Sequence, residues 1–150
     1  MKLNDKIYTD LKSAMKEGNK LKLQTIRSII ALLIEFEKSG SGKELNTEEE
    51  LKLLIFSAKK RKESIEQFRN AGREDLAKKE EEELLIIQTY LPEQLTVDKL
   101  RIRITEIAKK ISANNKEDFP KLMSVVMKEV KGSADGRLVR EIVTEILENK

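Results

Sequence analysis

Apolar residues recur three and four positions apart along nearly the whole chain, and only two prolines interrupt this spacing. A period of about 3.6 residues is typical of amphipathic α-helices, whereas half-buried strands alternate with a period of two. The pattern therefore predicts an all-α fold with seven helices. The first two cover about residues 4–17 and 20–38, the third runs from Thr47 to near Gly72, the fourth covers about residues 74–90, and the last three begin after Thr96, Asp118 and Asp135.

Helix ends can be predicted from residues that satisfy free backbone groups. Glycine stops a helix because it adopts the left-handed conformation without strain, and Gly18 and Gly132 stand at two expected ends. Thr47 with Glu50 three positions later predicts a capping box. Thr96, Asp118 and Asp135 are expected caps of the last three helices, with Pro120 tolerated in the first turn of the sixth.

Two breaks in the pattern predict the domain organisation. Serine and glycine at residues 39–42 indicate a flexible connector, and Pro92 forbids continuation of the fourth helix, so residues 91–95 are the best boundary. We expect a four-helix N-terminal bundle over residues 1–95 and a three-helix domain over residues 96–150. The second helix is apolar on most sides, which predicts that it is the buried centre of the first domain.

The composition excludes most catalytic chemistries. The chain has no histidine, cysteine or tryptophan, so it offers no imidazole base, no thiolate nucleophile and no cysteine or histidine ligand for zinc. Six glycines and 4% aromatic residues argue against phosphate-cradling loops and base-stacking platforms. We therefore expect no catalytic residue, no metal and no cofactor. Without cysteines or an apolar run of about 18 residues, the expected location is cytoplasmic and non-membrane.

Charge is unevenly distributed. The 30 basic and 27 acidic residues give a net charge of +3, which is too small to indicate nucleic-acid binding by itself. Residues 1–95 hold 18 basic and 18 acidic side chains, whereas residues 96–150 hold 12 and 9. The excess positive charge is therefore in the C-terminal domain.

Four charged residues fall on helix faces where apolar ones are expected. Arg27 lies on the second helix, Arg61 on the third, and Glu80 and Glu83 on the fourth. Because an unpaired buried ion is costly, we expect these arginines to meet these glutamates inside the N-terminal domain. A carboxylate pair for acid–base work is the functional interpretation. A structural ion-pair network is favoured, since carboxylates facing arginines make a poor catalytic pair.

Exposed basic residues are candidates for phosphate contacts. Lys121, Lys128 and Lys131 share the outer face of the sixth helix, and Arg137 and Arg140 share that of the seventh. The connection between them leads into a helix N-terminus, which attracts phosphate, although Asp135 would compete there as a cap. Further candidates on the N-terminal domain are Lys59, Lys60 and Arg73, for which a solvated basic surface is the alternative.

The chain resembles the GatB/YqeY family, whose members are similar to the tail domain of the B subunit of tRNA-dependent amidotransferases. The resemblance is carried by KKRKESIEQFRNAGREDLAKKEEEELLIIQTYLPEQLT at residues 59–96, TIRSI at 25–29 and KGSADGRLV at 131–139. One departure is Pro120, where the family usually has glycine. The resemblance implies a two-part helical fold with four N-terminal and three C-terminal helices, and a role beside enzymes that amidate Glu-tRNA or Asp-tRNA.

Three functions follow as hypotheses. The first is an RNA-binding accessory module, with tRNA as the expected partner, that holds phosphates through the C-terminal basic residues. The second is a protein–protein adaptor that docks on an aminoacyl-tRNA synthetase or an amidotransferase. The third, carbon–nitrogen ligase activity with glutamine as amide donor, is implied only by family association, because the chain lacks an amidase serine–lysine signature and a P-loop.

Overall fold

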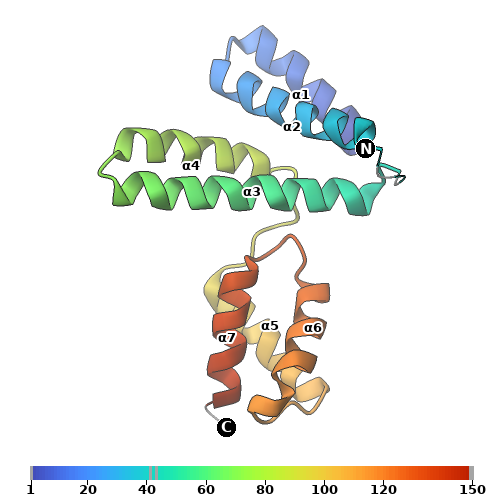
Figure 1. Cartoon of the computed structure of the whole chain (residues 1–150), viewed down its shortest axis with the longest axis vertical. Helices are drawn as coiled ribbons and strands as arrows, with labels where there is room; N and C mark the ends of the chain where they lie inside the picture. Colours follow the sequence, from blue (N-terminus) through green and yellow to red (C-terminus); the bar gives the residue numbers. More distant parts are fainter. Residues whose placement is uncertain (1, 41, 43, 149–150) are drawn as a thin grey trace. The chain divides into compact units, whose positions relative to one another are not determined.

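The structure is a computed structural model that describes residues 2–40, 42 and 44–148, and the described residues form helices without strands (Figure 1). This confirms the all-α prediction. In chain order the elements are α1 (Leu3–Glu17), α2 (Lys20–Lys38), α3 (Thr47–Asn70), α4 (Glu74–Gln88), α5 (Val97–Lys110), the 3-10 turn η1 (Lys116–Asp118), α6 (Phe119–Glu129) and α7 (Gly136–Glu148).

Several helix ends are built as expected. Gly18 follows α1 with φ of 67°, a left-handed conformation that costs other residues energy. The Thr96 hydroxyl accepts a hydrogen bond from the Lys99 N–H at 3.2 Å and caps α5. The Asp135 carboxylate accepts one from the Arg137 N–H at 3.0 Å at the start of α7.

Two predicted caps are wrong by a small shift. Asn46, not Thr47, caps α3, because its side chain accepts a hydrogen bond from the Glu49 N–H at 2.9 Å. Asp118 lies in η1 and makes no cap bond to α6. Its carboxylate instead accepts from the N–H groups of residues 114 and 115, which lower the pKa of Asp118. Where two cap-forming residues are close together, spacing alone does not choose between them.

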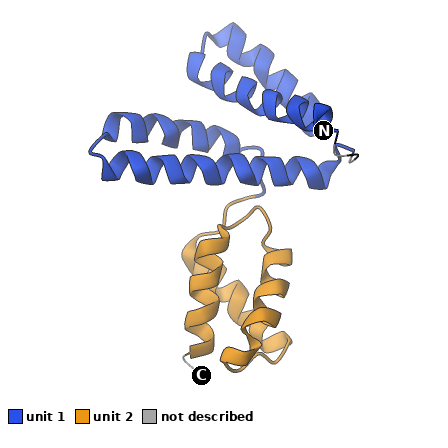
Figure 2. Ribbon diagram, viewed as in Figure 1, with its two compact units in different colours: residues 1–92 blue, residues 93–150 orange. Residues whose placement is uncertain are grey.

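The chain divides into two compact units, unit 1 (Met1–Pro92) and unit 2 (Glu93–Lys150) (Figure 2). The division lies within the segment 91–95, where Pro92 prevents a helix from continuing. In the connector at residues 39–42, Gly40 and Gly42 have φ of 71° and 75°, and Ser41 lies outside the described residues.

Unit 1 consists of two helical hairpins. α1 packs on α2 and α3 packs on α4, while α2 also contacts both α3 and α4. The apolar stripes of all four helices meet in one core, which explains why the spacing of three and four persists through them. The core residues are Ile7, Ala14, Ile26, Ile29, Leu33, Leu54, Ala58 and Ile87.

Unit 2 has a separate core, to which α5, α6 and α7 all contribute. Burial of each large apolar side chain contributes about 1.5–3 kcal/mol, so the three helices stabilise one another. No helix among the described residues has the length and apolar character needed to span a bilayer. The core residues are Leu100, Ile104, Ile107, Ala108, Ala113, Leu122, Val126, Val130, Val139, Ile142, Val143 and Leu147.

Candidate functional site

Five basic residues of unit 2 lie on α6, on α7 or in the connection between these two helices, which are in contact. Lys121 and Lys128 are exposed on α6, Arg137 and Arg140 are exposed on α7, and Lys131 is half-buried in the connection between them. We call these five residues the basic ridge. The apolar faces of α6 and α7 pack in the core of unit 2, so the charged side chains of these helices face solvent.

The connection between α6 and α7 is held by the first residues of unit 2. The Gln94 side-chain amide donates a hydrogen bond to the Gly132 carbonyl at 2.6 Å. The Leu95 N–H donates to the Ser133 carbonyl at 2.8 Å. These two bonds join residues far apart in sequence and tether the connection to the start of unit 2. The sequence offered no signal for this contact.

Asp135, just before α7, and Arg140, within it, determine which groups near the start of this helix can meet an anion. The Asp135 carboxylate already accepts the Arg137 N–H, so an incoming phosphate meets a negative charge at this end of the helix. Arg140 lies with its guanidinium carbon 5.7 Å from the centre of the Phe119 ring, a distance typical of cation–π contact. The arginine side chains of the ridge, rather than the backbone N–H groups, are therefore its main groups for an anion.

The candidate basic residues of unit 1 differ in whether their charged groups are available to contact a phosphate. Lys59 and Lys60 are exposed on α3, and the Lys60 ammonium lies 5.5 Å from the centre of the exposed Phe56 ring. Arg73 instead donates two hydrogen bonds of 3.2 Å to the Asp75 carboxylate. This pairing occupies the guanidinium fork that a phosphate would use.

Arg61 is the centre of a polar cluster among α2, α3 and α4. Its Nε lies 3.4 Å from a Glu83 oxygen, and the two side chains are only 17% and 12% exposed. The two terminal nitrogens donate to the hydroxyls of Ser57 and Ser28, both at 3.2 Å. Nε itself is buried without a hydrogen bond among the described residues, so its link to Glu83 is ionic. Sequence spacing missed the two serines, although small polar residues at inward positions were a usable signal.

Arg27 corrects the expectation of an inward arginine on α2. It is exposed, and it belongs to the same helix stripe as Ile34, which is 43% exposed. The buried residues of α2 are instead Thr25, Ile26, Ile29 and Leu33. Because α2 is apolar on most sides, periodicity did not identify which stripe faces the core.

Glu80 lies half-buried beside this cluster. Its burial, followed by its proximity to Glu83, raises the pKa of Glu80 above its ordinary value, although Arg61 acts in the opposite direction. The ionised form of Glu80 is therefore less favourable in the folded protein than in the unfolded chain. Arg61 thus pairs directly with Glu83, whereas its effect on Glu80 is an electrostatic one.

Replacing Glu80 with glutamine is expected to stabilise unit 1 near pH 7 by up to about 1 kcal/mol. Below the pKa of the unfolded chain, about 4.3, Glu80 is protonated in both states and costs the wild type no stability. As the pH rises through the raised pKa of the folded protein, Glu80 becomes ionised and the wild type loses stability. The advantage of Glu80→Gln should thus disappear at about pH 4. Chemical unfolding at both pH values measures the difference in unfolding free energy between Glu80→Gln and the wild type. Glu82→Gln, at an exposed position of the same helix, is the control. A wild type more stable than Glu80→Gln at pH 7 would contradict the assignment.

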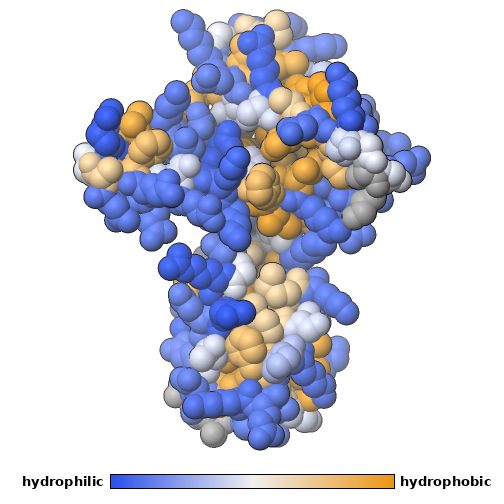
Figure 3. All heavy atoms as spheres, in the orientation of Figure 1, coloured by the Kyte–Doolittle hydropathy of each residue, from blue (hydrophilic) through white to orange (hydrophobic). Residues whose placement is uncertain are grey.

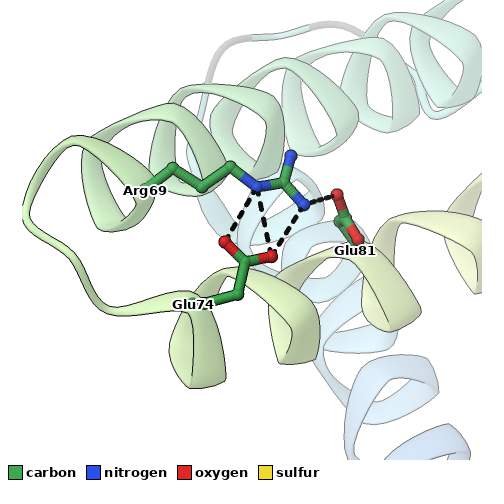
Figure 4. Close-up of polar contacts among 3 residues, drawn as sticks. All are labelled: Arg69, Glu74 and Glu81. Carbon is green, nitrogen blue, oxygen red and sulfur yellow. Dashed lines mark hydrogen bonds and ion pairs between the residues drawn. The ribbon is translucent and has the colours of Figure 1, made fainter.

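The turn between α3 and α4 has a separate, exposed ion-pair network (Figure 4). Arg69, near the end of α3, lies 3.3 Å from a Glu74 oxygen and also pairs with Glu81. Both partners raise the pKa of Arg69 by hydrogen bonding. These side chains are 41–70% exposed, so the network stabilises the turn only weakly. Among the described residues, no cluster of three or more acidic side chains is arranged to hold a metal ion.

The division after Pro92 changes the charge of each half. Glu93 belongs to unit 2, so unit 1 holds 18 basic and 17 acidic residues and unit 2 holds 12 and 10. The formal charges are +1 and +2. The net charges of the two units thus differ by only one, and the basic ridge holds five of the twelve basic residues of unit 2.

Comparisons with known proteins cover nearly the whole chain. The family model described as Yqey-like protein matches residues 4–147. A protein named altered inheritance of mitochondria protein 41, mitochondrial, from Pyrenophora tritici-repentis is 36% identical over 145 residues, which are 95% of this chain and 79% of that protein.

Two other fungal proteins carry the same name. The one from Vanderwaltozyma polyspora is 40% identical over 55% of this chain and 44% of its own length. The one from Clavispora lusitaniae is 34% identical over 73% of this chain and 64% of its own length. This chain thus spans less than two thirds of both relatives. All three names include the word mitochondrial, which contradicts the cytoplasmic location expected from the composition.

Proposed function

Because the chain belongs to the YqeY-like family, we propose that it is an RNA-binding accessory module related to the amidotransferase tail domain, with tRNA as its ligand. The observation that carries the proposal is the basic ridge on α6 and α7. It places Lys121, Lys128, Arg137 and Arg140 on exposed helix faces, with Lys131 in the connection between them. Lysine and arginine bind nucleic-acid phosphates by charge and hydrogen bonding.

Contacts that anchor the α6–α7 connection and Arg140 support this proposal. The Gln94 and Leu95 hydrogen bonds hold the connection, and the Phe119 ring positions the Arg140 guanidinium. A positioned cation loses less conformational entropy on binding than a free one. Lys59 and Lys60 of unit 1 are additional phosphate contacts in this proposal, whereas Arg73 contributes less because Asp75 occupies it.

The recognition proposed here depends on backbone charge and shape. Only six of the 150 residues are aromatic, so base stacking has few platforms. The chain lacks histidine and cysteine, and the five residues of the ridge are all lysines or arginines. We therefore assign binding to this chain and leave amide transfer to a partner enzyme.

The salt dependence of tRNA binding tests the proposal. If about five cations contact phosphates, the slope of log K against log salt should be about −4. The affinity of the full chain for total tRNA should then fall by about 250-fold between about 50 and about 200 mM salt. Filter binding over this range measures the slope. Binding that persists with a slope near zero, or its absence at low salt, would refute phosphate recognition.

A further inference from the structure

Unit 1 has a surface cavity of about 360 Å³ that the RNA proposal does not use. It lies among the first turns of α1, the first half of α3 and the residues after α4. Figure 3 shows hydrophobic residues at the surface of this unit. This volume is at the lower end of the range for small-ligand pockets, about 300–1,000 Å³, and suits a few side chains. The apolar lining comes from Leu3, Leu51, Leu54, Leu91 and Pro92.

Two polar residues of the cavity wall already have partners. The Lys6 ammonium donates a hydrogen bond to the Thr89 carbonyl at 3.1 Å and lies 5.2 Å from the centre of the Tyr90 ring. The Tyr90 hydroxyl donates to Asp10 at 2.6 Å. Burial and this hydrogen bond raise the pKa of Tyr90. The wall that carries these residues is therefore held in place before any ligand arrives.

Glu50 is the lining residue whose charge is not compensated in this way. It is half-buried, and no described residue donates a hydrogen bond to its carboxylate. Its burial raises the pKa of Glu50, and the charge of Lys2 offsets this only in part. A cationic donor that covers Glu50 would pair with the carboxylate and favour the ionised form.

We infer that this cavity is a docking site for a protein partner, which inserts apolar side chains against Leu51, Leu54 and Leu91 and places an arginine on Glu50. The charge of Glu50 and the apolar lining together select such a segment, since an apolar peptide without a cation leaves the carboxylate unpaired. An RNA backbone is disfavoured because its phosphates would meet Glu50 at close range. The inference does not depend on the RNA proposal, since the basic ridge lies in unit 2 and the lining of the cavity in unit 1 includes none of the proposed phosphate contacts.

Two model peptides test the inference with the full chain. Acetyl-GLRLG-amide carries an arginine between leucines, and acetyl-GLELG-amide differs only in the sign of that charge. The arginine peptide is expected to bind in the millimolar range and to shift the amide NMR signals of Glu50, Leu51 and Leu91. The glutamate peptide should bind at least about fivefold more weakly, the effect of one partly exposed ion pair.

The Glu50→Gln variant checks that this carboxylate causes the preference. It should bind both peptides with similar, weak affinity, whereas Glu49→Gln, one residue earlier in α3, should keep the preference for arginine. Far-ultraviolet circular dichroism verifies that both variants are folded. Equal shifts with both peptides in the wild type, or a preference that survives Glu50→Gln, would overturn the inference. So would shifts of these three signals by tRNA but by neither peptide.

Discussion

Simultaneous replacement of Lys131, Arg137 and Arg140 with glutamate is expected to lower the affinity for tRNA by at least about a hundredfold. Each reversal removes one phosphate contact and adds one repulsion, so three changes act on the same surface. The residues surround the α6–α7 connection, which the Gln94 and Leu95 hydrogen bonds hold in place. Filter binding of total tRNA at low salt measures the loss.

A charge-matched control separates this surface from bulk charge. Lys99, Lys109 and Lys110 are exposed residues of α5, and their replacement with glutamate changes the net charge from +3 to −3, as the first variant does. This control should retain most of the affinity. Equal losses in the two variants would show a non-specific charge effect, and equal retention would refute the ridge as the RNA site. Circular dichroism of both variants verifies the helices.

Replacement of Arg61 with methionine is expected to destabilise unit 1 by about 2–4 kcal/mol. The change leaves Glu83, which is 12% exposed, without its cation, and Glu80 loses the charge that opposes its raised pKa. It also removes the donors to the Ser57 and Ser28 hydroxyls. Both tyrosines, Tyr8 and Tyr90, lie in unit 1, so tyrosine fluorescence during urea unfolding reports on this unit alone.

Arg69→Met provides the matched control on the same helix. Arg69 also pairs with two glutamates, but it is 43% exposed, so its loss should destabilise the protein much less than the loss of Arg61. Adding Glu83→Leu to Arg61→Met should recover part of the loss, because the uncompensated buried charge is then gone. Equal destabilisation by Arg61→Met and Arg69→Met would show that burial of the Arg61 cluster has no energetic consequence.

The Arg61 cluster could be predicted from the sequence only in part. Charged residues on apolar faces indicated Arg61, Glu80 and Glu83, and the structure brings Arg61 within 3.4 Å of Glu83. The same rule failed for Arg27, since the apolar residues of α2 surround the helix and define no single inward face. The serines that accept from Arg61 come from two helices, and spacing within one helix carries no information on such contacts.

The cavity of unit 1 and the α6–α7 connection likewise could not be predicted from spacing along the sequence. Glu50 stood out in the sequence only as a capping residue, and its place in a cavity depends on α1 and on residues 89–92. No sequence pattern marks Gln94, which follows the boundary proline, yet its side chain donates a hydrogen bond to Gly132, 38 residues further along the chain. Both roles arise from contacts between distant segments.

The sequence by itself determined the all-α fold, the order of the helices and most of their ends. These features depend on apolar spacing, glycine and caps within a few residues, and such local interactions are encoded by neighbours along the chain. Only the tertiary structure decided which stripe of α2 is buried, which cations are neutralised by a neighbour, and where a carboxylate lines a cavity. Those outcomes depend on how helices pack, because the burial that sets the energy of a charge is supplied by segments far away in sequence.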